Sequence, residues 1–169
     1  MNYFTDYEEV VDAIISRQIS SVDEFLRRLK LHVEYLNDYE IEQKWLDNQI
    51  EATFYLRDRV ILLLMDLPPL VSLKATLHES GHILLGHQGN YLLSSMPVSG
   101  NNIEHAANMV SYALISWFYL CDHADEYHQV YTGLQDMANA YKIPRDDFEY
   151  FKEAYKFVLS KSVNTQIFG

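Results

Sequence analysis

The chain has 169 residues, of which 49% are hydrophobic and 22% are charged, a composition typical of one globular domain large enough to bury a core. Its net charge of −11 argues against sequence-independent binding of DNA or RNA, which needs clustered lysine and arginine, and against binding to an anionic membrane surface. Between Lys74 and Lys142 there is no lysine or arginine, and six of the seven histidines lie in that stretch. A cation-binding site in this stretch would therefore have no lysine or arginine from the same stretch to compete with the bound cation.

Two amphipathic helices are predicted near the start of the chain. Residues 7–17 carry apolar side chains at the spacing of one helix face. The stretch Ser21–Glu24 is a capping box and opens a second helix that runs to about residue 29. Two successive helices also occur in helix-turn-helix proteins, but residues 17–30 hold only four basic residues in an acidic chain. We therefore expect no direct contact with nucleic acid.

Three features bear on the compartment. Residues 1–10 are acidic and lack an apolar run, so we expect no signal peptide. Cys121 is the only cysteine, so no intramolecular disulfide can form, which predicts a reducing, cytoplasmic compartment. Because Asp122 and His123 follow it, Cys121 could be a nucleophile, but we expect a small buried residue. The uncharged run 106–121 is too short and too polar for a membrane span, so we interpret it as a buried helix.

A small sheet is predicted in the first half of the chain. Residues 31–36 alternate between apolar and polar side chains, and residues 37–49 are polar and acidic, as in a loop or a frayed helix. Residues 53–56 and 60–65 flank a polar turn at 57–59 and predict a hairpin. The fold class is therefore α+β: a mainly helical single domain with about three strands, antiparallel or mixed, packed on the helix that follows.

That following helix carries the main motif. The stretch His78-Glu79-Ser80-Gly81-His82 reads H-E-x-x-H and lies in a predicted helix over about 71–85, with Gly86 and Gly89 suited to its end. Residues four apart share one helix face. Two imidazoles at that spacing can bind one metal ion, with Glu79 beside the open position as a general base.

The second half is predicted to be helical. Residues 88–101 contain two glycines and a proline and form a loop with room for a short edge strand. Helices follow at about 102–121, 125–141 and 145–160. The tail from residue 161 is expected to be mobile.

A catalytic zinc needs a third protein ligand. His87 lies five positions after His82, about 140° further round a continuous helix, so we expect it to point elsewhere. The longer motif H-E-x-x-H-x-x-G-x-x-H is not met, because Leu85 and Gln88 stand where its glycine and histidine belong. Three further candidates lie beyond the next helix: Asp122, His123 and His128.

Glu104 is the best candidate for this third ligand. It falls in the first turn of a predicted helix, 22 residues after His82, with enough chain between them to return across the site. Asn108 shares its face and could hydrogen-bond a ligand histidine. The alternative is that Glu104 only complements the positive end of its helix. The small residues Ala106 and Ala107 beside it would permit close helix packing, which favours the ligand role.

These stretches together resemble the ImmA/IrrE-type zinc metallo-endopeptidases. The matching residues are Leu62–Met65, His78–His82 with Ile83–Leu85, and Glu104–Asn108, which reads E-x-x-A-N; a weaker match covers 138–144. The resemblance spans about residues 50–160 and implies a zincin-like core over 51–160, with residues 1–50 as a helical N-terminal extension. The family usually has Phe-Ala where Val110-Ser111 stand here, and leucine at Ser80.

The resemblance implies a cytoplasmic zinc protease of bacteria, phages or mobile elements that cleaves a partner repressor, often a helix-turn-helix protein. His78, His82 and Glu104 would hold Zn²⁺, and Glu79 would be the catalytic glutamate. Two alternatives stay open: a non-catalytic zinc protein that binds and sequesters a transcription regulator, and a scaffold with an empty site. Four residues are candidates to stabilise an oxyanion: Tyr91, His105, Tyr112 and His123.

Overall fold

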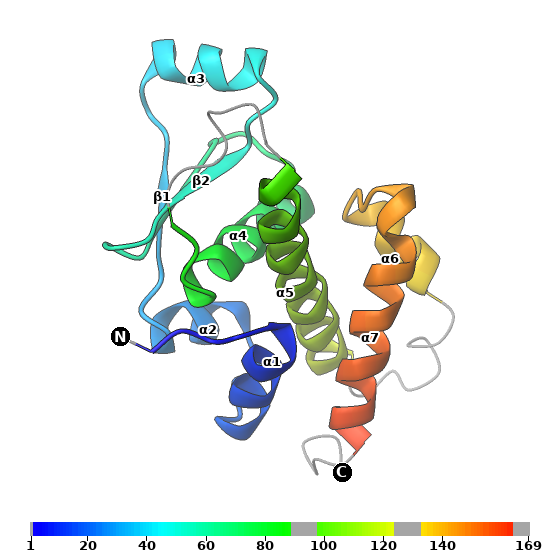
Figure 1. Ribbon diagram of the computed structural model, residues 1–169. Coiled ribbons are helices and arrows are strands. Elements are labelled where there is room, and N and C mark those ends of the chain that lie inside the picture. The colour runs from blue at the N-terminus through cyan, green and yellow to red at the C-terminus, as the bar shows by residue number, and fades with distance from the viewer. Residues whose placement is uncertain (1, 89–97, 124–132, 164–169) are drawn as a thin grey trace.

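The computed structural model describes residues 2–88, 98–123 and 133–163. Helix α5 (Val98–Asp122) runs through the middle of the molecule, with α4 (Pro69–Leu84) on one side and α7 (Phe148–Val163) on the other (Figure 1). Along α5, residues 109–118 are all buried. The interpretation of this uncharged run as a buried helix is therefore confirmed. No helix in the described ranges has the length and hydropathy of a membrane span.

The sheet is mixed and three-stranded, as predicted. Strands β2 (Ala52–Tyr55) and β3 (Val60–Leu63) form the expected antiparallel hairpin. Strand β1 (His32–Tyr35) pairs parallel with β3, so the order is β1-β3-β2, and β2 lies at an edge of the sheet that the described residues form. The sheet packs on α4 through β2 and β3. The α+β fold class, mainly helical with a small sheet on the motif helix, is confirmed.

Residues 7–31 belong to the same core. Helix α1 (Tyr7–Ser16) buries four apolar residues against α5 and α7. Helix α2 (Val22–Arg28) begins as predicted, with the Ser21 hydroxyl accepting a hydrogen bond from the backbone N–H of Glu24 at 3.2 Å. The indole of Trp117 in α5 donates to the carbonyl of Ile19 at 2.7 Å, which ties the turn after α1 to the central helix.

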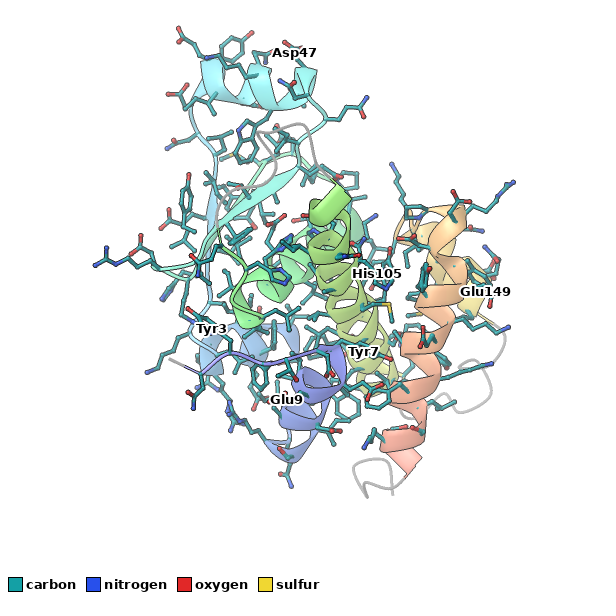
Figure 2. The ribbon with its side chains drawn as sticks, in the orientation of Figure 1. Tyr3, Tyr7, Glu9, Asp47, His105 and Glu149 are labelled. Atoms are coloured by element: carbon teal, nitrogen blue, oxygen red, sulfur yellow. The ribbon has the colours of Figure 1, made fainter. Side chains whose placement is uncertain are left out.

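Helix α3 (Tyr39–Asp47) forms where a loop or frayed helix was expected. Asp38 caps it by accepting a hydrogen bond from the N–H of Ile41 at 3.1 Å. Its one buried residue, Trp45, packs in a separate small cluster with Leu36, Ile50 and Leu64. Helix α3 lies beyond the sheet, at the opposite end of the molecule from α1, with Asp47 at one of its ends (Figures 1 and 2).

The second half differs from the prediction mainly at helix ends. Helix α5 begins at Val98, so the end of the predicted loop 88–101 is already helical. Residues 89–97, including the place of the suggested edge strand, lie outside the described residues. Of the predicted helix 125–141, the described part is α6 (Leu134–Ala140). A 3-10 turn at Arg145–Asp147 precedes α7, which continues to Val163, past the expected start of the tail.

Candidate metal centre

Helix α4 carries the H-E-x-x-H motif, and two buried hydroxyls in and next to the motif are hydrogen-bonded. The hydroxyls of Thr76 and Ser80 donate to the carbonyls four residues earlier, at 2.8 and 2.7 Å. These two side chains are buried, and the bonds remove the penalty of burying an unpaired hydroxyl. From the sheet side, Phe54 of β2 stacks on the ring of His82, with ring centres 4.8 Å apart and an angle of 13° between the planes. His82 is therefore held in a fixed orientation.

Close packing of α4 on α5 brings the third candidate ligand to the motif. A Cβ atom added to Gly81 would lie 3.0 Å from the carbonyl oxygen of Ala107 and 3.1 Å from Cβ of Val110. The two helices therefore approach as closely as they do because position 81 has no side chain. Glu104 lies one turn before Ala107 on α5, so this approach places its carboxylate over the two histidines.

The three predicted ligands meet at one point. Nε2 of His78 lies 2.9 Å from Oε2 of Glu104, and Nε2 of His82 lies 3.0 Å from Oε1 of Glu104. The two Nε2 atoms are 3.1 Å apart. His78, His82 and Glu104 thus form a group that could hold a metal ion, with all donor atoms within 4.8 Å of one another.

The donor set fits a zinc ion. Zinc bonds of about 2.0–2.2 Å in a tetrahedron place neighbouring ligand atoms about 3.3–3.5 Å apart, only a few tenths of an ångström more than the separations here. Oε1 of Glu104 is buried and has no hydrogen-bond partner within the described residues, despite its closeness to His82. Two ring nitrogens face each other at contact distance. A cation between these atoms would satisfy all of them at once.

Protonation of the group follows from its burial and mutual contacts. Burial opposes ionisation of Glu104, but the hydrogen bond from His78, the close contact with His82 and the charge of both histidines outweigh it, so its pKa lies below the ordinary value. Burial lowers the pKa of His82 and outweighs the opposing effect of the Glu104 carboxylate 3.0 Å away. At neutral pH the site therefore combines a carboxylate with a neutral imidazole at His82, which are metal-binding forms.

Glu79 lies beside this group with one free carboxylate oxygen. Its side chain is 3% exposed, and Oε2 has no hydrogen-bond partner among the residues described. Burial raises the pKa of Glu79 to about 7; the charge of His78 opposes this shift and that of Glu104 adds to it. Such a carboxyl group can take up and release a proton near neutral pH.

A cleft of about 220 Å³ opens beside Glu79 and His78. Residues 49–52, which lead into β2, form part of its wall, together with Asn108 and Tyr112 of α5. Lys74, one turn before His78, also lines it and donates from Nζ to the carbonyl of Lys142 at 2.9 Å. Lys74 was not predicted as a site residue, although its position four residues before a ligand places it on the same helix face.

His87 contradicts the prediction that it points away from the site. Its Nδ1 atom lies 2.8 Å from Nδ1 of His82. The helix does not continue to residue 87: Gly86 adopts a left-handed conformation with φ +73°. The N–H groups of Gly86 and His87 bond to the carbonyls of Ile83 and His82, at 3.1 and 2.9 Å. This pattern is a Schellman motif, which brings the second residue after the C-cap back over the third residue from the end of the helix, here His87 over His82.

The remaining candidates fall in different places. The side chain of Asn108 hydrogen-bonds His78, as expected for a residue that orients a ligand. The hydroxyl of Tyr112 donates to Oδ2 of Asp147 at 2.6 Å. His105 is exposed and stacks edge-on against Tyr150 at 4.6 Å, on the side of α5 that faces α7 (Figure 2).

Residues at the far end of α5 are remote from the site. His123 is 19 residues beyond Glu104, about 28 Å along a helix, and stacks on Tyr119; Asp122 is its neighbour. Burial raises the pKa of Cys121 to about 12, with a contribution from Asp122, so this thiol is not an activated nucleophile. Tyr91 and His128 lie outside the described residues.

Comparison with known proteins adds no relative: no family model, no curated protein and no solved structure matches the chain.

Proposed function

We propose that this protein is a zinc-dependent metallo-endopeptidase. The observation that carries the proposal is the convergence of His78, His82 and Glu104 on one point, with the buried carboxyl group of Glu79 beside His78 in the wall of a cleft. Two histidines and a glutamate, with one position left for water and substrate, are a ligand set of catalytic zinc. The resemblance to ImmA/IrrE-type peptidases supports the same function.

Each residue has a defined part in the proposed hydrolysis. A zinc ion held by His78, His82 and Glu104 would supply Lewis acidity, polarising the scissile carbonyl and making water acidic enough to lose a proton near neutral pH. Glu79 takes the proton of the attacking water as the carbon–oxygen bond forms. It then delivers that proton to the amide nitrogen as the carbon–nitrogen bond breaks, leaving a carboxylic acid and an amine.

The cleft suggests how a polypeptide would be held. Among the described residues, strand β2 lies at an edge of the sheet, and residues 49–52 at its start line the cleft beside Glu79. A sheet edge can pair with an extended peptide through main-chain hydrogen bonds. Lys74 and Tyr112 also line this cleft, so both can reach a substrate carbonyl or its flanking groups. The proton of the Tyr112 hydroxyl is directed to Asp147, which makes Lys74 the better donor to a developing oxyanion.

The proposed substrate is a cytoplasmic helix-turn-helix repressor. The net charge of −11 complements a basic DNA-binding protein and would favour encounter with it. Helix α3 adds exposed apolar side chains, with Tyr39 at 73% and Leu46 at 52% exposure. These same features favour a second function, in which the protein binds a transcription regulator without cutting it.

Co-expression with a candidate helix-turn-helix repressor separates the two functions. The endopeptidase predicts two repressor fragments, whose masses define one cleaved bond, and no cleavage when 1,10-phenanthroline removes zinc. A stable complex with intact repressor would support the sequestering function and refute the peptidase. Loss of cleavage in Glu79→Gln, with zinc still bound, would exclude a contaminating protease.

A further inference from the structure

The two ring nitrogens of His82 face different partners. Nε2 lies at the metal centre, 3.1 Å from Nε2 of His78 and 3.0 Å from Glu104. Nδ1 lies 2.8 Å from Nδ1 of His87. His82 is 1% exposed, so solvent does not compete for either nitrogen. Which histidine donates the hydrogen bond between the two Nδ1 atoms therefore decides whether Nε2 of His82 can bind a metal.

A hydrogen bond between two imidazole nitrogens needs one donor and one acceptor. A neutral imidazole has one of each. If His82 donates from Nδ1, its Nε2 keeps a lone pair that a metal can use. If His87 donates instead, Nε2 of His82 carries the proton and cannot bind a metal. The direction of this one hydrogen bond therefore separates a metal-binding form of His82 from a form that cannot bind.

The surrounding structure holds both rings in place. Phe54 stacks on one face of His82, and the rings of His78 and His87 meet it edge-on at 4.8 and 5.1 Å. The Schellman motif fixes the backbone of His87 over His82. At Gly86, a Cβ atom would lie 2.6 Å from the ring of Tyr3, so the N-terminal segment packs directly on this turn. His87 is thus placed by backbone geometry and not by a flexible loop.

We propose that His87 is a positioning residue for the metal centre. It accepts a hydrogen bond from Nδ1 of His82 and so presents the Nε2 lone pair to the ion. His87 does not act as a fourth ligand, because it contacts Nδ1 of His82, which lies on the side of the His82 ring that faces away from Glu104. The inference rests on the metal site of the proposed function, and it is independent of whether the site hydrolyses peptides.

Two nearly isosteric substitutions separate hydrogen bonding from packing. His87→Asn offers an amide oxygen near the position of Nδ1, whereas His87→Leu fills a similar volume and offers no acceptor. The exposed His32 of β1 provides a matched control, His32→Ala, for loss of a histidine elsewhere. Each full-length protein is stripped of metal and titrated with Zn²⁺ against a chromogenic chelator. Circular dichroism verifies that each variant is folded.

We expect His87→Leu to bind zinc about 10–100-fold more weakly than wild type, the effect usual for losing a partner of a ligand histidine. His87→Asn should stay within about threefold, and His32→Ala should match wild type. Nitrogen-15 spectra of the zinc-loaded wild type should show a proton on Nδ1 of His82 that exchanges slowly with water. That proton should exchange rapidly in His87→Leu.

The outcomes distinguish this inference from the proposed function. Equal zinc affinity in wild type and His87→Leu would overturn the positioning role, whatever the peptidase activity. Equal losses in the leucine and asparagine variants would also overturn it, because the effect would then be one of packing. A wild type that binds zinc, shows the slowly exchanging proton and cleaves no repressor would support the positioning role and refute the peptidase.

Discussion

Substituting Gly81 by alanine tests whether close helix packing builds the metal centre. The added Cβ would lie 3.0 Å from the carbonyl oxygen of Ala107, 3.1 Å from Cβ of Val110 and 3.2 Å from Cα of Ala107. Carbon atoms in ordinary contact are about 3.5–4.0 Å apart. Two of these three atoms belong to the backbone, so a rotamer change cannot relieve the clash. Helix α5 would have to move away from α4 by about half an ångström.

Moving helix α5 away from α4 changes the stability of the protein and its affinity for zinc by different amounts. Overpacking a core typically costs about 1–3 kcal/mol, while alanine gains about 0.8–1.0 kcal/mol over glycine inside a helix. The net loss of stability is therefore about 0–2 kcal/mol, or up to ~8 °C in Tm. Glu104 is one turn from Ala107 and moves with it. Metal sites tolerate errors of only about 0.2 Å in ligand distance, so zinc affinity should fall at least tenfold, about 1.4 kcal/mol.

Zinc affinity and thermal unfolding are measured on the same preparations of metal-free protein. Ser72→Ala, at a half-buried position in the same helix, is the matched control and should leave zinc affinity unchanged. Gly81→Ser should weaken binding at least as much as Gly81→Ala. If Gly81→Ala binds zinc as tightly as wild type, Glu104 does not depend on this close approach, and the packing argument for the site is wrong.

The remaining predictions concern the acidic residues and the turn after α4. Glu79→Gln should keep zinc affinity within about threefold but lower kcat at least 100-fold, since it removes the general base; equal turnover would show that another group takes the proton. In metal-free protein, burial raises the pKa of Glu79 to about 7, above its ordinary value of 4.5, so the contribution of Glu79 to stability is fullest below pH 4.5 and falls by about 3 kcal/mol as the pH rises to 7. Urea unfolding at pH 5 and pH 8 should show that loss in wild type and a smaller one in Glu79→Gln. Glu104→Gln should weaken zinc binding at least 100-fold by removing a charged ligand, and retained stoichiometric zinc at micromolar protein would exclude Glu104 from the ligand set. Gly86→Ala should lower Tm by several degrees, because φ +73° and contact with Tyr3 both exclude a side chain; Tyr3→Ala added to it should recover only part of that loss.

His87 shows where reasoning from sequence stopped short. The rotation of 140° assumed a helix that continues to residue 87. Gly86 was recognised as suited to a helix end, and a glycine in that position places the next residue over the third residue from the end of the helix, here His82. The signal was present in the sequence. Predicting the position of His87 required the geometry of the helix cap, and not only the recognition that a cap is present.

Helix α3 shows a different limit. Its sequence is polar and acidic, and one side chain, Trp45, anchors it to the small cluster with Leu36, Ile50 and Leu64. These partners come from three other segments of the chain. A helix stabilised by one tertiary contact and one cap has little periodicity of its own, so local pattern could not distinguish it from a loop.

The sequence by itself determined the elements and the chemistry of this protein: the hairpin, the buried helix α5, and two histidines on one face of α4 with Glu79 beside them. Those features follow from periodicity and spacing within single elements, which the chain specifies locally. Only the tertiary structure decided that Glu104 stands over both histidines and that β1 joins β3 in parallel. Each of these depends on how closely separate segments approach, and that is decided by packing across the core, here by the missing side chain of Gly81 against Ala107.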